Sequence, residues 1–197
     1  MRRAEQKDKR LVVDILSKSF DKNKSVNYVV KQDANRQDRI RSLMEYSFNT
    51  CLSFGEIWIS DDNMACALLL FPETKKTTLR SILWDVNLAT SAIGLTRVID
   101  VLKRESLIKK NHPDKPFTYL WFIGVDPLAQ KRGVGSKLLN EVIDMNAKKR
   151  RPIYLETSVS NNLSWYKKFG FEIYQKINLN YDLYLLRRSE AAVPVSV

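Results

Sequence analysis

The sequence of 197 residues contains few cysteines and histidines, and this scarcity excludes several classes of protein. Cys51 and Cys66 are the two cysteines; they lack the spacing of a metal site or a disulfide framework. We therefore expect two reduced core residues, no metal and a cytoplasmic location. The single histidine, His112, precedes Pro113 in a polar segment, where we expect it at the surface. A Ser-His-Asp hydrolase would depend on this one residue and is disfavoured.

The sequence also lacks a long apolar run. The longest, ACALLLF at 65–71, is far shorter than the roughly 20 residues that a membrane span needs. The basic start, MRRAEQKDKR, has no apolar segment behind it, so we expect neither a secretory signal nor a membrane partner.

Acidic residues are outnumbered, because 33 Lys and Arg face 22 Asp and Glu, for a net charge of +11. Nucleic acid, phospholipid surfaces and phosphorylated cofactors would all attract such a chain. The densest cluster, KKRR at 148–151, ends an expected helix, where it either complements the helix dipole or forms a dedicated anion site. No RNA-binding or helix-turn-helix pattern is present, so we do not expect nucleic acid as a partner.

Hydrophobic periodicity predicts helices, a hairpin, further helices and then the order β-α-β-α-β-β. Two apolar stripes within 77–110 mark helices separated at Gly94, and the aromatic run 117–125 is typical of a strand buried on both faces. These stripes consist of Leu79, Ile82, Leu83 and Val86, and of Leu95, Val98, Ile99 and Leu102. The expected helices are 11–20, 36–52, two within 77–110, one from residue 130 and 162–170; the strands are 55–60, 64–71, 117–125, 152–158, 171–180 and 181–188.

No linker or repeat divides the chain. We expect one domain over residues 1–190, with a flexible tail at 191–197. The element order predicts an α/β (α+β) fold with a mixed sheet and helices on its faces.

The stretch VDPLAQKRGVGSKLL (125–139) places Gly133 and Gly135 at the first turn of a helix, where each glycine costs roughly 1 kcal/mol relative to alanine. A helix N-terminus has unpaired N–H groups and partial positive charge, and glycines let an anion approach that backbone. A Walker A loop requires a glycine, four further residues and then GK[ST]. This chain reads GSK at 135–137, which excludes such a loop. Leu138 stands where a dinucleotide fingerprint needs its third glycine.

These residues resemble the acetyl-CoA signature of the GNAT N-acetyltransferases. A later block, YLETSVSNNLSWYKKFGFE (154–172), is similar to the family's second motif. Its sequence is especially similar to that of the puromycin N-acetyltransferase branch. Together the motifs cover about residues 117–175. The first motif matches at Val125, Pro127, Gln130, Gly133, Gly135, Leu138 and Leu139.

The resemblance implies a largely antiparallel central sheet whose fourth and fifth strands splay apart, with helices on both faces. It implies acetyl-CoA as cosubstrate, with the pyrophosphate on the glycine turn and the pantetheine arm along the fourth strand. Asn162 would bind that arm, although Val159 stands where many relatives have a second asparagine. The implied binding residues are Ile123, Gly124, Val125, Gln130, Lys131, Arg132, Gly133, Val134, Gly135, Ser136, Asn162 and Tyr166.

The same resemblance implies direct attack by an amine in a ternary complex. Tyr166 would act as general acid, and the Val125 N–H would polarise the thioester carbonyl. The base stays open between water and Glu156, the nearest carboxylate by sequence. The weaker carboxylate alternatives are Glu56, Asp61 and Asp126.

The leading hypothesis is acetyl transfer to a primary amine of a small molecule. We expect the acceptor site among segments 17–37, 56–71 and 77–110, with Tyr28, Trp58 and Trp84 as lining candidates. A protein or peptide N-acetyltransferase and a non-catalytic acyl-CoA-binding protein are the alternatives. The chain could act as a monomer or a homodimer.

Overall fold

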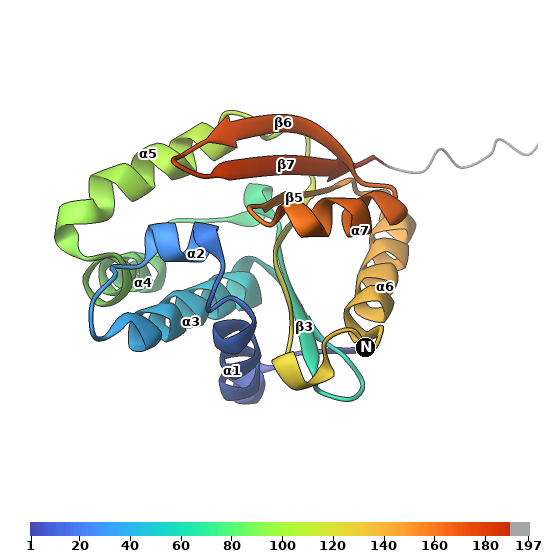
Figure 1. Cartoon of the computed structure of the whole chain (residues 1–197), viewed down its shortest axis with the longest axis horizontal. Helices are drawn as coiled ribbons and strands as arrows, with labels where there is room; N and C mark the ends of the chain where they lie inside the picture. The colour runs from blue at the N-terminus through green and yellow to red at the C-terminus, as the bar shows by residue number, and fades with distance from the viewer. Residues whose placement is uncertain (190–197) are drawn as a thin grey trace, which may run out of the picture.

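The computed structural model describes residues 1–189 and contains one seven-stranded sheet in the order β1-β2-β3-β4-β5-β7-β6 (Figure 1). All neighbouring strands are antiparallel except β4 and β5, as expected for a mixed, largely antiparallel sheet. The tail expected at 191–197 lies outside the described residues. The strands are β1 Arg2–Arg3, β2 Gly55–Ile59, β3 Ala65–Leu70, β4 Thr118–Val125, β5 Ile153–Thr157, β6 Glu172–Asn178 and β7 Asp182–Arg188.

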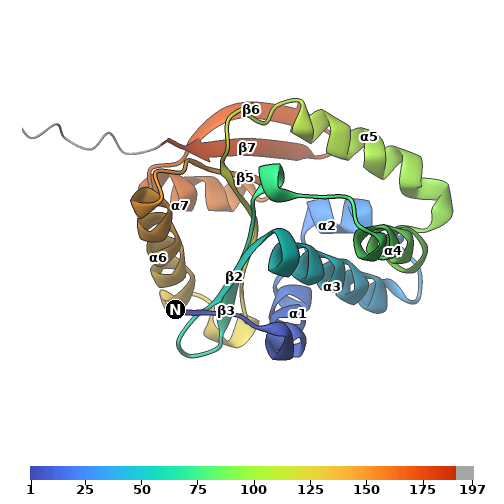
Figure 2. The same cartoon turned by 180° about the vertical axis from the view of Figure 1, so that it is seen from behind.

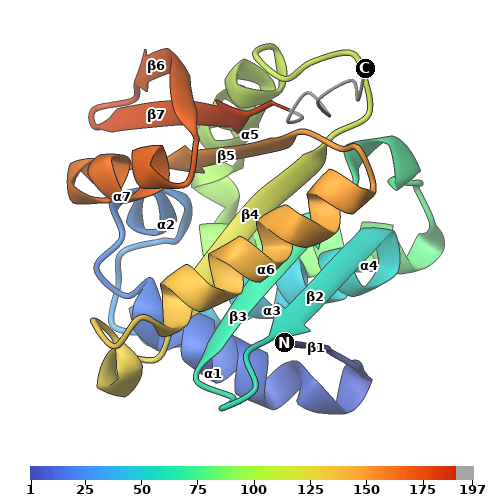
Figure 3. The same cartoon turned by 90° about the vertical axis from the view of Figure 1, so that its right-hand side faces the viewer.

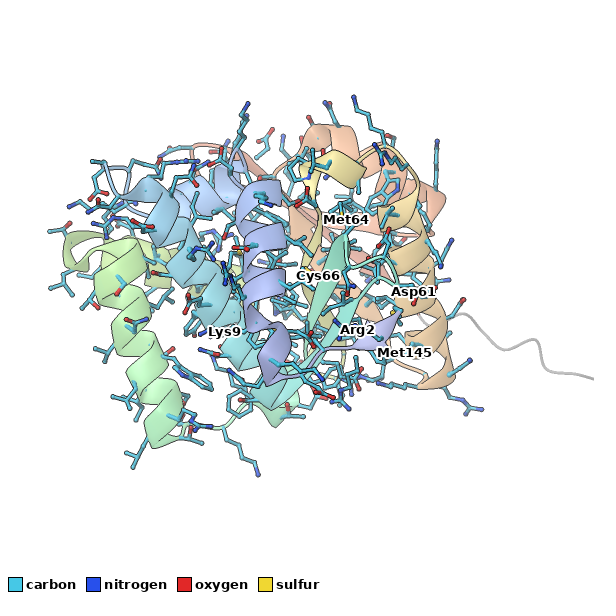
Figure 4. All side chains as sticks on the ribbon, turned by 90° about the horizontal axis from the view of Figure 1, so that it is seen from below. Arg2, Lys9, Asp61, Met64, Cys66 and Met145 are labelled. Carbon is cyan, nitrogen blue, oxygen red and sulfur yellow. The ribbon has the colours of Figure 1, made fainter. Side chains whose placement is uncertain are left out.

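Helices cover both faces of the sheet. Helices α1 (Lys9–Ser19) and α3 (Arg36–Phe54) pack on one face, and α6 (Val134–Lys148) crosses the other (Figures 1 and 3). Two separate apolar clusters result, one beneath α1 and α3 and one beneath α6. The two cysteines are free and buried, and Figure 4 shows Cys66 on β3, between α1 and α6.

The expected hairpin forms although its loop has no glycine. Strands β2 and β3 pair from Gly55↔Leu70 to Ile59↔Cys66. In the loop, Asn63 adopts the left-handed conformation, with φ of 58°, that glycine usually supplies. The Ser60 hydroxyl donates to Asp62, and the Asp62 carboxylate accepts the Met64 N–H at 3.0 Å. The polar loop residues therefore close the hairpin.

Strand β4 differs from the expectation of burial on both faces: its residues alternate between buried and half-buried. A β-bulge opposite Leu68 and Leu69 adds Trp121 as an extra residue. As a result, Trp121 and Phe122 both pack toward the α1 and α3 cluster. Beyond the bulge, Ile123 and Val125 pack against the cluster beneath α6.

Strands β4 and β5 separate soon after they meet. They pair only at Thr118↔Ile153 and Tyr119↔Tyr154, after which β5 pairs with β7 alone. Figure 3 shows β4 diverging from β5 beyond this point. The implied splay of the fourth and fifth strands is therefore confirmed, and it leaves one edge of β4 unpaired from Leu120 onward.

The segment 77–110 forms α4 (Leu79–Asn87), a π-helix (Leu88–Ile93), a 3-10 turn (Leu95–Arg97) and α5 (Val98–Lys109). The expected break at Gly94 is confirmed: its φ is 81°, and the helices on either side bend by 100°. Among residues 1–189, no single helix is long and apolar enough to cross a bilayer. The two arms of this bent pair reach the length and apolar composition of a membrane span only when they are counted together.

Two short helices complete the fold. Helix α2 (Lys24–Val29) lies in a segment whose polar sequence did not indicate a helix. Its N-terminus is capped by Asn23, whose side chain accepts the Val26 N–H at 3.1 Å. Helix α7 (Leu163–Lys168) is followed by Gly170, with φ of 76°, as the sequence predicted.

Candidate functional site

The glycine turn joins the end of β4 to the start of α6. A 3-10 turn (Pro127–Ala129) begins it, and the Asp126 carboxylate accepts the Leu128 N–H at 3.0 Å. Lys131 and Gly133 then both adopt positive φ, 62° and 82°. Gly133 is the N-cap residue of α6, and no side chain caps that N-terminus among the described residues. The first N–H groups of α6 are thus left to a ligand or to water.

The two glycines serve different ends. A Cβ on Gly133 would meet no atom within 4 Å, so this glycine permits the left-handed backbone and leaves open space in front of the turn. A Cβ on Gly135 would lie 3.0 Å from the Val125 side chain. This second glycine is therefore explained by the close packing of α6 on β4, and only the first by access to the backbone.

The surroundings of the turn suit a diphosphate. Gln130, Lys131 and Arg132 are exposed, and Val134, Gly135 and Ser136 form the half-buried first turn of α6. A cradle of free N–H groups, two cations and open space at Gly133 fits the pyrophosphate that the sequence predicts here.

The free edge of β4 leads directly to this turn. The Asp126 N–H donates to the carbonyl of Met64, the residue before β3, at 2.7 Å. Because successive N–H groups alternate across a strand, those of Ile123 and Val125 point to the splayed edge. The Gln130 side chain accordingly reaches the Val125 carbonyl at 3.3 Å. An extended ligand arm can add to this edge as a strand would.

Tyr166 lies on α7, in the same apolar cluster as α6, with only 6% of its surface exposed. Burial raises its pKa, so the phenol stays protonated at neutral pH. The neighbouring Trp165 indole donates to the Ser136 hydroxyl at 3.0 Å, which fixes α7 to the first turn of α6. Asn162 is exposed just before α7, and its backbone N–H bonds the Val159 carbonyl.

Glu156 lies on β5, two residues beyond the last pairing with β4, and its side chain is 8% exposed. One carboxylate oxygen is 3.1 Å from His112 Nε2, and the other accepts the Tyr119 hydroxyl. Burial and the adjacent carboxylate raise the pKa of Tyr119, which stays a hydrogen-bond donor. The expectation that His112 is a surface residue is wrong: its side chain is 12% exposed and packs on the Phe117 and Tyr119 rings.

Tyr166 and Glu156 lie toward opposite faces of the sheet. Tyr166 belongs to the cluster beneath α6, whereas the Tyr119 ring beside Glu156 packs against the cluster of α1 and α3. Glu156 is the one of the two that follows the last pairing of β4 with β5 on the strand itself.

The other carboxylates considered as bases are engaged elsewhere. Glu56 pairs with Lys149 at 2.7 Å, and Asp61 with Lys137 at 3.0 Å. The third of them, Asp126, pairs with Lys18 at 3.1 Å in addition to closing the glycine turn.

The aromatic residues named from the sequence do not share one site. Trp58 packs with the cluster beneath α6. Tyr28 contacts Tyr181, which follows β6, on the side of α2 and α5. Trp84 lies half-buried on α4. The rings nearest the splay were missed by the sequence: Tyr119 stacks on Trp121 at 6.2 Å, and Tyr46 meets Trp121 edge-on at 6.1 Å.

Comparison with known proteins shows which proteins share this fold. Residues 94–173 match the model of the acetyltransferase (GNAT) domain. A histone acetyltransferase HPA2-related protein from Corynebacterium glutamicum is 20% identical, with a TM-score of 0.70 over 98% of this chain and 97% of that one. Arylalkylamine N-acetyltransferase 2 from Aedes aegypti is 14% identical, with a TM-score of 0.62 over 96% and 98%.

A third similar structure acts on a protein, according to its name. The ribosomal-protein-S18-alanine N-acetyltransferase from Escherichia coli is 15% identical, with a TM-score of 0.54 over 100% of this chain and 96% of that one. The similar structures thus share an architecture and differ in acceptor. The chain therefore has the fold of the GNAT acetyltransferases, and its residues 94–173 match the model of that family's domain.

Proposed function

We propose that this protein transfers the acetyl group of acetyl-CoA to a primary amine of a small molecule. One observation carries the proposal. The unpaired edge of β4 ends at an uncapped helix N-terminus, and Glu156 lies on β5 just beyond the point where the two strands separate. In the proposal, Tyr166 reaches the same gap from the cluster beneath α6. A long anionic thioester fits such a track from its diphosphate to its reactive end.

The cosubstrate supplies an activated acetyl group as a thioester. The backbone from Gln130 to Gly135 would hold the pyrophosphate, with Lys131 and Arg132 adding positive charge. The edge of β4 at Ile123 to Val125, together with Asn162, would hold the pantetheine arm. The N–H of Val125, which points to that edge, would donate to the thioester carbonyl.

The reaction then needs three proton movements. Glu156 takes a proton from the ammonium form of the acceptor, and the amine nitrogen attacks the thioester carbonyl carbon to form the C–N bond. The C–S bond breaks, and the thiolate takes a proton from the Tyr166 hydroxyl. The attacking nitrogen gives its second proton to water, water reprotonates Tyr166, and the proton on Glu156 passes to the solvent.

His112 and Tyr119 act as positioning residues in this scheme. Each bonds one oxygen of Glu156 and so fixes the carboxylate beside the splay. Placing both reactants in one gap supplies most of the rate enhancement, roughly 7–11 kcal/mol in well-oriented systems. The acid is needed less, because a thiol with a pKa near ~8.5 is a fair leaving group.

The choice of a small molecule has two supports. Tyr119, Trp121 and Tyr46 form an aromatic wall on the Glu156 side of the splay. The segment 77–110, which resembles the insertion of antibiotic-acetylating relatives, continues from that side, where Asp85 of α4 accepts the Tyr46 hydroxyl at 2.7 Å. The similarity of residues 154–172 to the puromycin N-acetyltransferase branch favours the same choice.

The test is a thiol-release assay with acetyl-CoA and a panel of aminonucleosides, polyamines, arylalkylamines and peptides. We expect turnover with at least one small amine and none without an acceptor. Faster turnover of peptides would overturn the small-molecule assignment. Calorimetric binding of acetyl-CoA without thiol release from any amine would identify a non-catalytic binding protein instead.

A further inference from the structure

Helices α4 and α5 expose apolar faces to solvent. On α4, Leu79, Ile82, Leu83 and Val86 follow the spacing of one helix face, and Leu79 is 84% exposed. On the second arm, Leu95, Ile99 and Leu102 form a similar face, and each is more than 60% exposed.

Both helices lie at the end of the molecule opposite α6 (Figures 1 and 2). They continue from one another through the bend at Gly94. Soluble monomers rarely expose a contiguous apolar patch larger than a few hundred Å². We call these seven side chains the α4–α5 apolar surface; so many exposed aliphatic side chains within one segment indicate an interaction site.

The charges around this surface have one dominant sign. Residues 75–110 contain eight Lys or Arg and three Asp or Glu. Two of the three acids are engaged, Asp85 by the Tyr46 hydroxyl and Glu105 by Arg104. Six cations are exposed and form no ion pair among the described residues: Lys75, Lys76, Arg80, Lys103, Lys109 and Lys110.

The exposed cations of this segment indicate what kind of partner covers the surface. A second copy would bring the same cations against this surface, and the two would repel each other. An anionic bilayer offers hydrocarbon for the leucines and headgroup charge for the lysines, which is the pattern of helices that lie in a membrane interface. We propose that the α4–α5 apolar surface docks on an anionic lipid surface. This proposal is independent of the acetyl-transfer proposal.

Interfacial docking does not need the long apolar run whose absence led us to expect no membrane partner. A helix lying in the plane of the interface buries only one face, and its opposite face packs on protein. Here the buried positions are Ser81 of α4 and Val101, Arg104 and Ile108 of α5. The bent pair is thus anchored to the fold on one side and apolar on the other.

The test measures co-sedimentation of the full chain with large unilamellar vesicles. We expect binding to vesicles of phosphatidylcholine mixed with phosphatidylserine, little binding to phosphatidylcholine alone, and release by salt. The double variant Leu79→Ser/Leu83→Ser should bind at least tenfold more weakly. The exposed apolar Ile173 on β6 provides the control Ile173→Ser, which should bind as the parent does.

A second pair of variants tests the charges. Lys103→Ala/Lys110→Ala should weaken binding by about 25-fold, at about fivefold per cation. Arg10→Ala/Lys22→Ala changes the net charge equally at exposed positions outside the segment and should have a much smaller effect. Circular dichroism and thermal unfolding establish that every variant is folded.

Three results would overturn the proposal. The first is no vesicle binding by the folded parent, and the second is equal binding to neutral and anionic vesicles. The third is a dimer in light scattering that Leu79→Ser/Leu83→Ser dissociates, because a second copy would then be the occupant. Thiol release by the same variants is measured separately, so failure of one proposal does not decide the other.

Discussion

Helices α6 and α4 carry equally clear apolar stripes, yet the fold uses them in opposite ways. Leu138, Leu139, Val142 and Ile143 of α6 are buried against the sheet. The matching stripe on α4 faces solvent, while its opposite face, with Ser81, is turned inward. The comparison shows that periodicity identifies a helix and its apolar face but does not say whether that face meets the chain's own core.

The regions that contain α6 and α4 also differ in where they depart from simple packing. In 117–175, the departures from simple packing gather at one gap: the bulge at Trp121, the left-handed Gly133 and the buried Glu156. In 79–110, the departures are exposed leucines and unpaired lysines on the outside. In our proposals, the first region holds a ligand between strands and the second meets a lipid surface.

The largest expected difference between the two helices is in stability. Leu139→Ala removes a fully buried side chain and should lower the free energy of unfolding by about 2–5 kcal/mol. Leu83→Ala, at a 68% exposed position on α4, should change it by no more than about 0.5 kcal/mol. Urea denaturation of both variants gives the two values. Similar losses would mean that α4 is covered in the isolated chain.

Glu156→Gln tests whether the gap contains the base. We expect kcat to fall between about 10²- and 10³-fold, because the amide cannot take the amine's proton. Acetyl-CoA affinity, measured by calorimetry, should hold. The matched control is Glu172→Gln on β6, an exposed carboxylate paired with Arg187, which should keep full activity. Full activity in Glu156→Gln would assign the proton to water.

Tyr166→Phe should lower kcat by about 10²-fold or less in a steady-state assay, because the thiolate leaves without full protonation. Burial raises the pKa of Tyr166 above the ordinary tyrosine value near ~10. Ionisation of this phenol should therefore cause no loss of rate at any pH below that value. Tyr184→Phe, whose hydroxyl bonds Asp182 at 3.4 Å, is the control. Unchanged kcat in Tyr166→Phe would remove this residue from the mechanism.

The two glycines give the smallest and most specific contrast. Gly133→Ala places a side chain in the left-handed region, at a cost of roughly 1–2 kcal/mol in stability, and fills the open space before the turn. It should therefore also weaken coenzyme A binding. Gly135→Ala crowds Val125 and should act on stability alone. Calorimetric titration with coenzyme A separates them, and equal affinities would limit Gly133 to a backbone role.

Much of the fold follows from local signals. The strand at 117–125, the glycine turn, α6 and the short helix that carries Tyr166 all lie where the sequence predicts them. Each depends on neighbours within a few residues: β-branched runs, proline at the end of a strand, glycine at the start of a helix. Helix α2 was missed because its six residues contain few apolar positions to establish a period.

The Glu156 cluster could not be found in the same way. His112 and Glu156 are 44 positions apart, and Tyr119 reaches the carboxylate only because β4 and β5 pair at Tyr119↔Tyr154. A proline-rich loop indicated a surface histidine, but that loop returns over the sheet and packs the imidazole against Phe117. No short stretch of sequence contains this contact.

The sequence alone determined most of the elements, the order in which they follow one another and the glycine turn before α6, because spacing and backbone preference act over a few residues. Only the tertiary structure decided where β4 leaves β5, which side chains hold Glu156 and which helix faces point outward. Those outcomes depend on strand register and on competition between faces for one core, and both are set by contacts between distant parts of the chain.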